Sequence, residues 1–304
     1  MYNKIKYFVF LLSFSLIPLS ISCKSEDVKP EAYVEYAPIT QALLDSTNLI
    51  SKVFSDTTFT VAPGVEETDI HYLSMSGLTM RIFFFKVDLK QEGLSLVPIT
   101  PYGSTGYAMQ TIPDMLPWVD ASLGKVVAAV NADFFNMSTG EPRGVVHVNG
   151  EAVRTSLLEN RSFFGLDKQG KLVIGSTEEY PEFKENLEHA LGGGDVLIKD
   201  YAKPVISNQA VHPRTAVGIT ANEEVYFMVV DGRQFDYSNG MTLSELSDVF
   251  YALGVKDAAN LDGGGSSTFV SLHSDADVWH IRNRPSDGDP RPVANGWAVS
   301  VLSE

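Results

Sequence analysis

Short runs of β-branched and aromatic residues recur along most of this 304-residue chain, and turn residues separate them. Such runs predict strands, since branched and aromatic side chains pack well on a pleated surface. Asn149-Gly150, between two of the runs, is a hairpin signal. Many short strands with few helices predict an α+β fold, in which one large domain holds a mixed or antiparallel sheet and a few flanking helices. The predicted strands and hairpins cover residues 78–89, 125–135, 144–153, 162–175 and 214–233.

Two segments carry helical patterns. Thr242, with Glu245 three residues later, forms a capping-box pattern that predicts the start of a helix. Apolar residues then recur at helical spacing as far as Leu253, and Gly254 stands where a left-handed C-terminal cap is expected. Residues 39–54 also have an apolar stripe at helical spacing, which predicts an N-terminal helix.

The N-terminus has the pattern of an export signal. Lys4 and Lys6 precede a strongly apolar stretch over residues 7–22, which ends in small residues at Cys23. This resembles the cleavage site of bacterial lipoproteins, where the cysteine is lipidated, although the usual leucine three residues before the cysteine is absent. We therefore predict a lipoprotein signal peptide over residues 1–22. The alternative is an ordinary signal peptide followed by an incidental cysteine.

The rest of the domain organisation follows from Cys23. The polar, proline-containing segment after it predicts a tether, so residues 23–58 are expected to hold the tether and the N-terminal helix, and residues 59–304 the main domain. A lipidated Cys23 implies a bacterial cell-envelope protein that is anchored to the membrane and faces the periplasm or the cell surface. Cys23 is the only cysteine, so the exported domain has no internal disulfide and depends on its apolar core.

Charge excludes one class of partner. The formal net charge is -15, which disfavours binding to nucleic acids or to anionic membrane surfaces through bulk electrostatics. An acidic protein can still hold an anion locally where arginines cluster.

Polar residues directly follow several of the apolar runs. Strand ends lead into loops, and loops on a rigid sheet are where sites are built. For any one of these ends a plain β-turn is the alternative, since Asp-Gly is common turn chemistry. Six such ends in one domain nevertheless indicate a site. They carry Asn131 with Asp133, then Arg143, Gly192 to Asp195, Arg214, Asp231 to Arg233, and Asp262 to Ser267.

Glycine-rich loops together with arginines fit an anion. Successive backbone N–H groups without side chains form a concavity for phosphate-like oxygens, and arginine clamps phosphate through two parallel hydrogen bonds. Carboxylates perform acid, base or nucleophilic work at a sugar carbon. The sequence has no phosphate loop of the P-loop type, no Gly-x-Ser-x-Gly elbow and no His-Glu-x-x-His zinc motif. Of the histidines, only His212 is expected near the site, and His147 is expected to be structural.

Several motifs, in this order, resemble those of the phosphodiester glycosidase family. They are NADFF, LGGGDVLI, HPRTAVG, VVDGR, GMTLSELSDVFYALGVKDAANLDGGGSSTF and RPVANGWAV. The resemblance covers residues 60–304 and is strongest between Arg214 and Phe269. It implies that residues 59–304 are a phosphodiester glycosidase domain, which cleaves the sugar C1–O bond of a glycosyl phosphodiester on a glycan or glycolipid. An N-acetylglucosamine 1-phosphodiester is the type of substrate implied, and bacterial members of the family are often associated with exopolysaccharide.

The resemblance also implies roles for the residues at the strand ends. Asp262 would face the reacting sugar, the glycines after it would let backbone N–H groups approach the substrate, and Arg214 and Arg233 would hold the phosphate. The nucleophile or base among the carboxylates stays open. The expected catalytic residues are Asp133, Asp195, Asp231 and Asp262. The expected contacts with the sugar or phosphate are Asn131, Arg143, Arg214, Gly232, Arg233, Gly263, Gly264, Gly265, Ser266 and Ser267.

Two other functions stay open at this point. A phosphodiesterase would cleave the P–O bond with a metal bound by the aspartates, and a surface glycan-binding lipoprotein would bind without turnover. No cofactor is certain, and a divalent cation held by Asp133, Asp231 and Asp262 stays an alternative. The expected partners are a sugar phosphodiester or phosphorylated glycan and, through the lipid anchor, a membrane. The oligomeric state is open.

Overall fold

The computed structural model describes residues 34–156, 161–273 and 276–302, and residues 36–304 form one compact unit. The predicted signal peptide and the lipidation site at Cys23 lie outside the described residues. Residues 36–58, which the sequence assigns to a tether and a helix, belong to the compact unit as helix α1 and the first part of strand β1. In the described part of the chain, no helix is long and apolar enough to span a bilayer.

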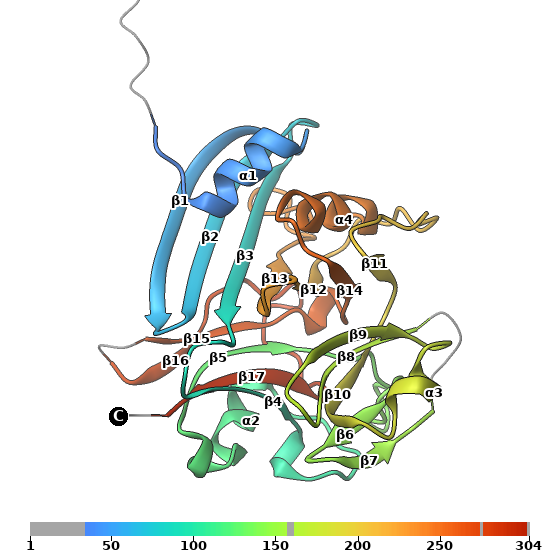
Figure 1. The fold of residues 1–304 in the computed structure, drawn as a ribbon. Coiled ribbons are helices and arrows are strands. Elements are labelled where there is room, and N and C mark those ends of the chain that lie inside the picture. The colour runs from blue at the N-terminus through green and yellow to red at the C-terminus, as the bar shows by residue number, and fades with distance from the viewer. Residues whose placement is uncertain (1–33, 157–160, 274–275, 303–304) are drawn as a thin grey trace, which may run out of the picture. The chain divides into compact units, whose positions relative to one another are not determined.

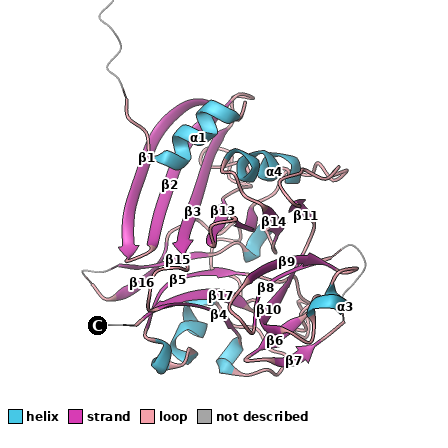
Figure 2. Ribbon diagram, in the orientation of Figure 1, coloured by secondary structure: helices cyan, strands magenta, loops and turns pink. Residues whose placement is uncertain are grey.

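The described strands form three antiparallel sheets, which confirms the predicted α+β class but divides the strands among more than one sheet (Figure 2). In spatial order, the first sheet contains β1 (Ile50–Ala62), β2 (Val65–Ser74), β3 (Thr79–Asp88), β13 (Glu224–Val230), β12 (Arg214–Ile219), β14 (Asp257–Asn260) and β11 (Val196–Ile198). The second contains β7 (Glu151–Arg154), β6 (Val146–Val148), β10 (Leu187–Gly193), β8 (Ser162–Asp167) and β9 (Leu172–Ser176). The third contains β16 (Val278–Ile281), β15 (Phe269–His273), β5 (Lys125–Asn131), β17 (Gly296–Val301) and β4 (Leu94–Ile99).

The helices are short and lie between or beside the strands (Figure 1). The α-helices are α1 (Pro38–Ser46), α2 (Ile112–Met115), α3 (Tyr180–Phe183) and α4 (Leu243–Ala252). The short 3₁₀ turns are η1 (Pro101–Gly103), η2 (Leu116–Trp118), η3 (Ala121–Leu123) and η4 (Gly264–Ser266).

The first sheet is the middle layer of the compact unit. Side chains alternate along β3, so that Phe83 and Phe85 pack against the second and third sheets while Phe84 packs beneath α1 and α4. The ring of Phe85 stacks on that of Phe269 from the third sheet, with centroids 3.8 Å apart. Both faces are therefore buried in the middle of the first sheet, which explains the apolar runs of β3, β12 and β13, whereas the edge strand β1 is mostly exposed.

Local sequence signals agree with the structure at the turns. Asn149 and Gly150 have φ angles of 51° and 75° and close the β6–β7 hairpin. Thr242 and Glu245 form the predicted capping box, with Thr242 N–H 2.8 Å from Glu245 Oε2, and Gly254 follows the helix with φ 67°. These features depend only on residues close together in the sequence, so the sequence predicts them.

The predicted helix over residues 39–54 is wrong in its second half. Helix α1 ends at Ser46, where the Thr47 hydroxyl donates to the Leu43 carbonyl at 2.6 Å. Strand β1 begins at Ile50 and pairs with β2 along its whole length. The hydrogen bonds of this hairpin override the helical periodicity, because intrinsic propensity is weaker than tertiary context.

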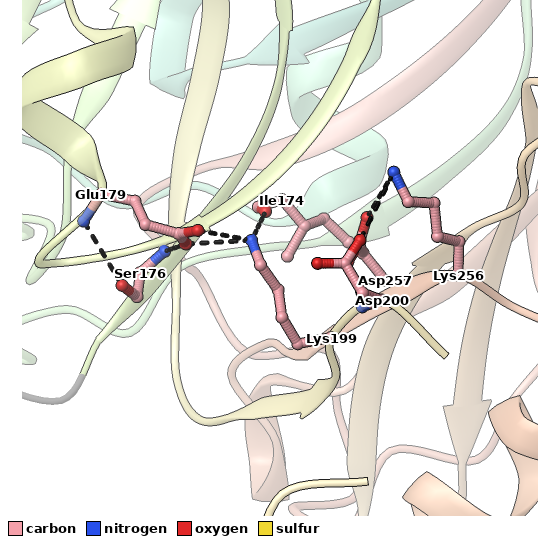
Figure 3. A network of polar contacts seen from close by, with 7 residues as sticks. All are labelled: Ile174, Ser176, Glu179, Lys199, Asp200, Lys256 and Asp257. Carbon is pink, nitrogen blue, oxygen red and sulfur yellow. Dashed lines mark hydrogen bonds and ion pairs between the residues drawn. The ribbon is translucent and has the colours of Figure 1, made fainter. Parts of the chain in front are cut away.

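A polar network ties the second sheet to the first (Figure 3). The Lys199 ammonium, just after β11, lies 2.8 Å and 3.0 Å from the two carboxylate oxygens of Glu179 and donates to the Ile174 carbonyl of β9. On the other side, Asp200 N–H donates to Asp257 Oδ1 at 2.9 Å. Exposed ion pairs contribute little to stability, so the network mainly fixes the position of β11, which Asp195 directly precedes.

Candidate active site

Asn131 joins the end of β5 to the glycine-rich loop after β14. Its Nδ2 donates to the Asp262 carbonyl at 2.6 Å, and its Oδ1 accepts from Thr268 N–H at 3.0 Å and from the Thr215 hydroxyl at 2.8 Å. Asp262 N–H in turn donates to the Ala132 carbonyl at 2.7 Å. Asn131 is 1% exposed, so in this structure its side chain holds the glycine-rich loop in place through hydrogen bonds.

Asp133 follows directly and is also 1% exposed. Its Oδ2 accepts from Gly144 N–H at 2.7 Å, while Oδ1 has no hydrogen-bond partner among the described residues. Burial, reinforced by the nearby negative charge of Asp262, raises the pKa of Asp133 to about 7. A carboxyl with this pKa can hold a proton and release it at neutral pH.

Two glycines make this buried position possible. A Cβ atom on Gly192 would lie 2.6 Å from the Gly144 Cα and 2.7 Å from Asp133 Oδ2. No side chain fits between Gly144 and Gly192, so the backbone of these two glycines covers the Asp133 carboxyl.

Asp262 is the second carboxyl of the site. Burial raises its pKa to about 6, while a hydrogen bond from Ser266 and the charges of Arg291 and Arg161 lower it. The charge of Asp262 also contributes to the raised pKa of Asp133. Two interacting carboxyls with different surroundings are the arrangement that divides acid and base roles.

The three glycines after Asp262 make room for close neighbours. Gly264 has φ 64°, and its N–H already donates to the Pro213 carbonyl at 2.9 Å. A Cβ on Gly264 would lie 3.2 Å from the Arg233 guanidinium, and one on Gly265 would lie 2.1 Å from the Arg291 guanidinium. The glycines therefore bring two arginine side chains against the loop, and the Gly264 N–H is not free for a ligand.

Arg233 and Arg291 differ in how they are held. Arg233 is exposed, has φ 60°, and makes one side-chain contact among the described residues, from Nη2 to His212 Nδ1 at 3.4 Å. Arg291 pairs with Asp287 through Nε and Nη2, and its Nη1 donates to the Ser266 hydroxyl at 3.3 Å. A non-glycine residue at positive φ is strained, and such strain clusters at functional sites.

Arg214 lies beside the glycine-rich loop, whereas Arg143 contacts the segment after β5. Arg214 is 7% exposed, and its side chain donates to the backbone carbonyls of Met241 and Ala210. Those donors are occupied, so Arg214 supports the segment before β12. Arg143 is half-buried, and its N–H donates to the Phe134 carbonyl at 2.8 Å.

Asp231 lies on the other side of the glycine-rich loop. Its Oδ1 accepts from Asn283 Nδ2 at 2.9 Å and its Oδ2 from Arg284 N–H at 2.8 Å, and burial raises its pKa to about 6. The Asn283 amide also donates to the Ser267 carbonyl at 3.0 Å. Both Asp231 oxygens are thus occupied in tying the loop to the segment after β16.

The remaining predicted residues, Gly232, Ser267 and Asp195, lie in three different surroundings. A Cβ on Gly232 would lie 2.8 Å from the Gly240 Cα, so close packing requires this glycine. Ser267 is 1% exposed and its hydroxyl has no partner among the described residues. Asp195 is exposed and, with Arg161, lines a cavity of about 250 Å³.

Sequence reasoning missed two arginines of the site. The Arg161 guanidinium lies over the Phe134 ring at 4.3 Å, and its charge lowers the pKa of both Asp133 and Asp262. Arg161 directly precedes a predicted hairpin and has no motif around it, whereas Arg291 stands in the motif RPVANGWAV, which by itself assigns no role to it. Among the described residues, no group of three or more histidine, cysteine or acidic side chains is arranged to hold a metal ion.

Known proteins similar to this chain point to one family. Residues 124–300 match the family model described as phosphodiester glycosidase. An N-acetylglucosamine-1-phosphodiester alpha-N-acetylglucosaminidase from Bos taurus is 29% identical over 187 residues, which are 52% of this chain and 35% of the relative. The enzyme of that name from Mus musculus is 31% identical over 162 residues, 47% of this chain and 31% of the relative. The chain thus spans about a third of the length of these curated relatives.

Solved structures show the same fold at low sequence identity. The zebrafish catalytic domain of that name, auto-inhibited by its pro-peptide, has a TM-score of 0.62 at 21% identity and covers 82% of this chain and 88% of its own. A hypothetical protein from Synechocystis has a TM-score of 0.61 at 14% identity and covers 81% of this chain and 64% of its own. At these identities the likeness shows the fold alone.

Proposed function

Because the chain belongs to the phosphodiester glycosidase family, we propose that it hydrolyses the bond between the sugar C1 and the phosphate oxygen of a glycosyl phosphodiester. An N-acetylglucosamine 1-phosphodiester on a glycan or glycolipid is the proposed substrate. One observation carries the proposal: a hydrogen bond from Asp262 N–H to the Ala132 carbonyl joins the segments of Asp133 and Asp262, at the same loop that Arg233 and Arg291 touch.

The arginines would hold the phosphate. Arg233 has no carboxylate partner among the described residues, and one guanidinium edge of Arg291 is turned to Ser266. A phosphomonoester is a good leaving group, so stabilising its charge matters more than protonating it. Preorganised guanidinium groups supply that stabilisation as the C1–O bond breaks.

The carboxyls would act at the sugar carbon. Water adds its oxygen to C1, a carboxylate accepts the proton of that water, and the phosphomonoester leaves with the bonding electron pair. The pKa of Asp133, about 7, suits proton exchange at neutral pH. Asp262, with a pKa of about 6, is the more ionised of the two at pH 7 and would stabilise positive charge on the sugar.

Hydrolysis in ¹⁸O-labelled water tests this proposal. A panel of N-acetylglucosamine 1-phosphodiesters is incubated with the protein, and the products are analysed by mass spectrometry. Cleavage at C1–O puts the label into the sugar. Label in the phosphate would show P–O cleavage and favour the metal-dependent phosphodiesterase, and binding without turnover would favour a glycan-binding lipoprotein.

The lipid anchor is a proposal that rests on sequence alone. Cys23, at the end of an apolar segment with basic residues before it, is the residue that would be lipidated in a bacterial cell envelope. We expect Cys23→Ala to leave the protein uncleaved, or soluble after export. Membrane fractionation of wild type and variant measures this, and equal membrane fractions of processed protein would contradict the anchor.

A further inference from the structure

Two aromatic rings are exposed at the edge of the third sheet, in a segment that precedes the proposed catalytic carboxyls in the chain. Tyr102 and Trp118 are each 55% exposed, and their ring centroids lie 6.2 Å apart with an interplanar angle of 77°. Tyr102 belongs to η1 and Trp118 to η2, which follow β4 in the chain. We call these two rings the aromatic shelf.

The backbone around the shelf is held in an unusual conformation. Tyr102 has φ 59° and ψ 22°, a left-handed conformation in which a bulky residue is an outlier. Its N–H donates to Gln110 Oε1 at 2.9 Å, which fixes that conformation. Gly103 follows with φ 62°, and a Cβ there would lie 3.2 Å from the Trp118 Cβ. Local strain that the surroundings maintain in this way is a mark of functional positions.

A cavity of about 230 Å³ opens beside Trp118. Strand β4 forms one wall, and the β6–β7 turn and β10 of the second sheet form another, so the cavity lies where two sheets meet. It has the volume of about eight water molecules in the liquid, which suits one pyranose ring. Apolar atoms share the lining with Asn149, His189 and Asp120, and the lining includes no lysine or arginine among the described residues.

The polar groups of the lining suit hydroxyls. Asn149 N–H donates to His189 Nδ1 at 3.2 Å, so the neutral ring carries its proton on Nε2 and keeps that N–H as a donor. Burial lowers the pKa of His189, which keeps the ring neutral at pH 7. Asp120 Oδ1 accepts from Ser122 N–H at 2.8 Å, and the Ser122 hydroxyl also hydrogen-bonds to this exposed carboxylate, which has further acceptor capacity. A neutral donor and a carboxylate acceptor match sugar hydroxyls, and the negative charge of the carboxylate disfavours phosphate.

We propose that this cavity and the aromatic shelf bind a neutral sugar residue of an oligosaccharide. The apolar C–H face of the ring packs on Trp118, and its hydroxyls meet Asn149, His189 and Asp120. Exposed aromatic side chains with few rotatable bonds make such contacts at low entropic cost. The binding step is independent of hydrolysis at Asp133 and Asp262.

The shelf adjoins the chain segment that carries two residues of the candidate active site. Gln110, which holds Tyr102, forms a bridge with Val293, from Gln110 N–H to the Val293 carbonyl at 3.1 Å and from Val293 N–H to the Gln110 carbonyl at 2.8 Å. Val293 stands between Arg291 and Asn295, whose Oδ1 accepts from Asp133 N–H at 2.9 Å. The bridge therefore ties the segment that holds Tyr102 to the segment that carries Arg291.

Tryptophan fluorescence tests the proposal directly. Of the three tryptophans, Trp297 is 1% exposed and the indole N–H of half-buried Trp279 donates to Val126, so Trp118 dominates the quencher-accessible emission. We expect at least one of four neutral tetrasaccharides, made of N-acetylglucosamine, glucose, mannose or galactose, to shield Trp118 from acrylamide. N-acetylglucosamine 1-phosphate should not shield it.

Calorimetric titration with the shielding tetrasaccharide then separates the shelf from other sites. Trp118→Ala should weaken binding by at least about tenfold, or about 1.4 kcal/mol, and Trp118→Phe should retain most of the affinity. Tyr251→Ala, which removes an equally exposed ring from α4, should bind as wild type does. The proposal is overturned if none of the tetrasaccharides shields Trp118, if only the sugar phosphate does, or if Trp118→Ala and Tyr251→Ala bind alike while both melt at the wild-type temperature.

Discussion

At the scale of single residues, the Asp133 carboxyl is the group of the candidate site whose surroundings best suit a general acid or base. It is almost fully buried, one of its oxygens has no partner among the described residues, and its pKa is about 7. We expect Asp133→Asn to lower kcat by about 10²- to 10⁴-fold on a sugar phosphodiester, the range for loss of a general acid or base. The amide oxygen can still accept from Gly144 N–H, so the fold should be kept.

Asp195→Asn is the matched control for this experiment. Asp195 is exposed and lines the adjoining cavity with Arg161, so its change should affect kcat by less than about threefold, or ~0.7 kcal/mol. Steady-state kinetics and thermal melts on the same preparations check both variants. Near-normal kcat in a folded Asp133→Asn protein would remove Asp133 from the proposed chemistry.

Arg233 tests the phosphate contact, because it is exposed, strained and has no carboxylate partner among the described residues. Arg233→Lys keeps the charge and loses the planar fork. We expect kcat/KM to fall by an amount that corresponds to about 2–3 kcal/mol. Arg154→Lys is the control, since Arg154 lies on β7 and pairs with Glu141. It should leave kcat/KM unchanged. If kcat/KM fell by less than about threefold in Arg233→Lys, the proposed phosphate contact of Arg233 would be wrong.

At the scale of elements, the loop between β14 and β15 couples backbone conformation to the arginines. Gly264 has φ 64°, and a methyl group there would press on the Arg233 guanidinium. We expect Gly264→Ala to destabilise the fold by about 1–2 kcal/mol and to lower turnover about a hundredfold, the scale of a 1 Å displacement in a site. Thermal melts and kinetics on one preparation measure both effects.

Gly170→Ala separates the two effects of that substitution. Gly170, in the β8–β9 turn, has φ 79°, and a Cβ there would meet no atom within 4 Å. The conformational cost should resemble that of Gly264→Ala, while activity should be unchanged. Equal, near-normal turnover in the two folded variants would mean that the glycine-rich loop is only a turn between strands.

What the sequence predicts at this scale depends on the range of the interactions. The capping box of α4 and the hairpin turn at Asn149-Gly150 are set by adjacent residues, and both are confirmed. The sequence indicates the polar residues at the strand ends but not the contacts that they make. The amide of Asn131 reaches the Asp262 carbonyl across 131 positions, and Arg161 reaches the same site from a segment without a motif. Only the packing of the three sheets decides such contacts.

At the scale of the whole molecule, buried carboxyls give stability a pH dependence. Burial raises the pKa of Asp133 to about 7 and those of Asp231 and Asp262 to about 6, whereas an unfolded chain titrates aspartate near ~3.9. Between about pH 4 and 7 the folded state holds protons that the unfolded state has lost. The contribution of these three carboxyls to the free energy of unfolding is therefore fully present below about pH 4 and is lost as the pH rises through the folded pKa values.

Asp133→Asn isolates one part of this effect from the general repulsion of a chain with net charge -15. The variant cannot take up the proton, so the slope of unfolding free energy against pH should become shallower by up to about 1.4 kcal/mol per pH unit, one proton's worth, between about pH 5 and 7. Urea unfolding at several pH values measures the slope, and Asp195→Asn, at an exposed carboxylate, should retain the wild-type value. The same slope in wild type and Asp133→Asn would mean that Asp133 is ionised in the folded protein at pH 5. Asp133 would then be a weaker base toward the attacking water than a pKa of about 7 implies.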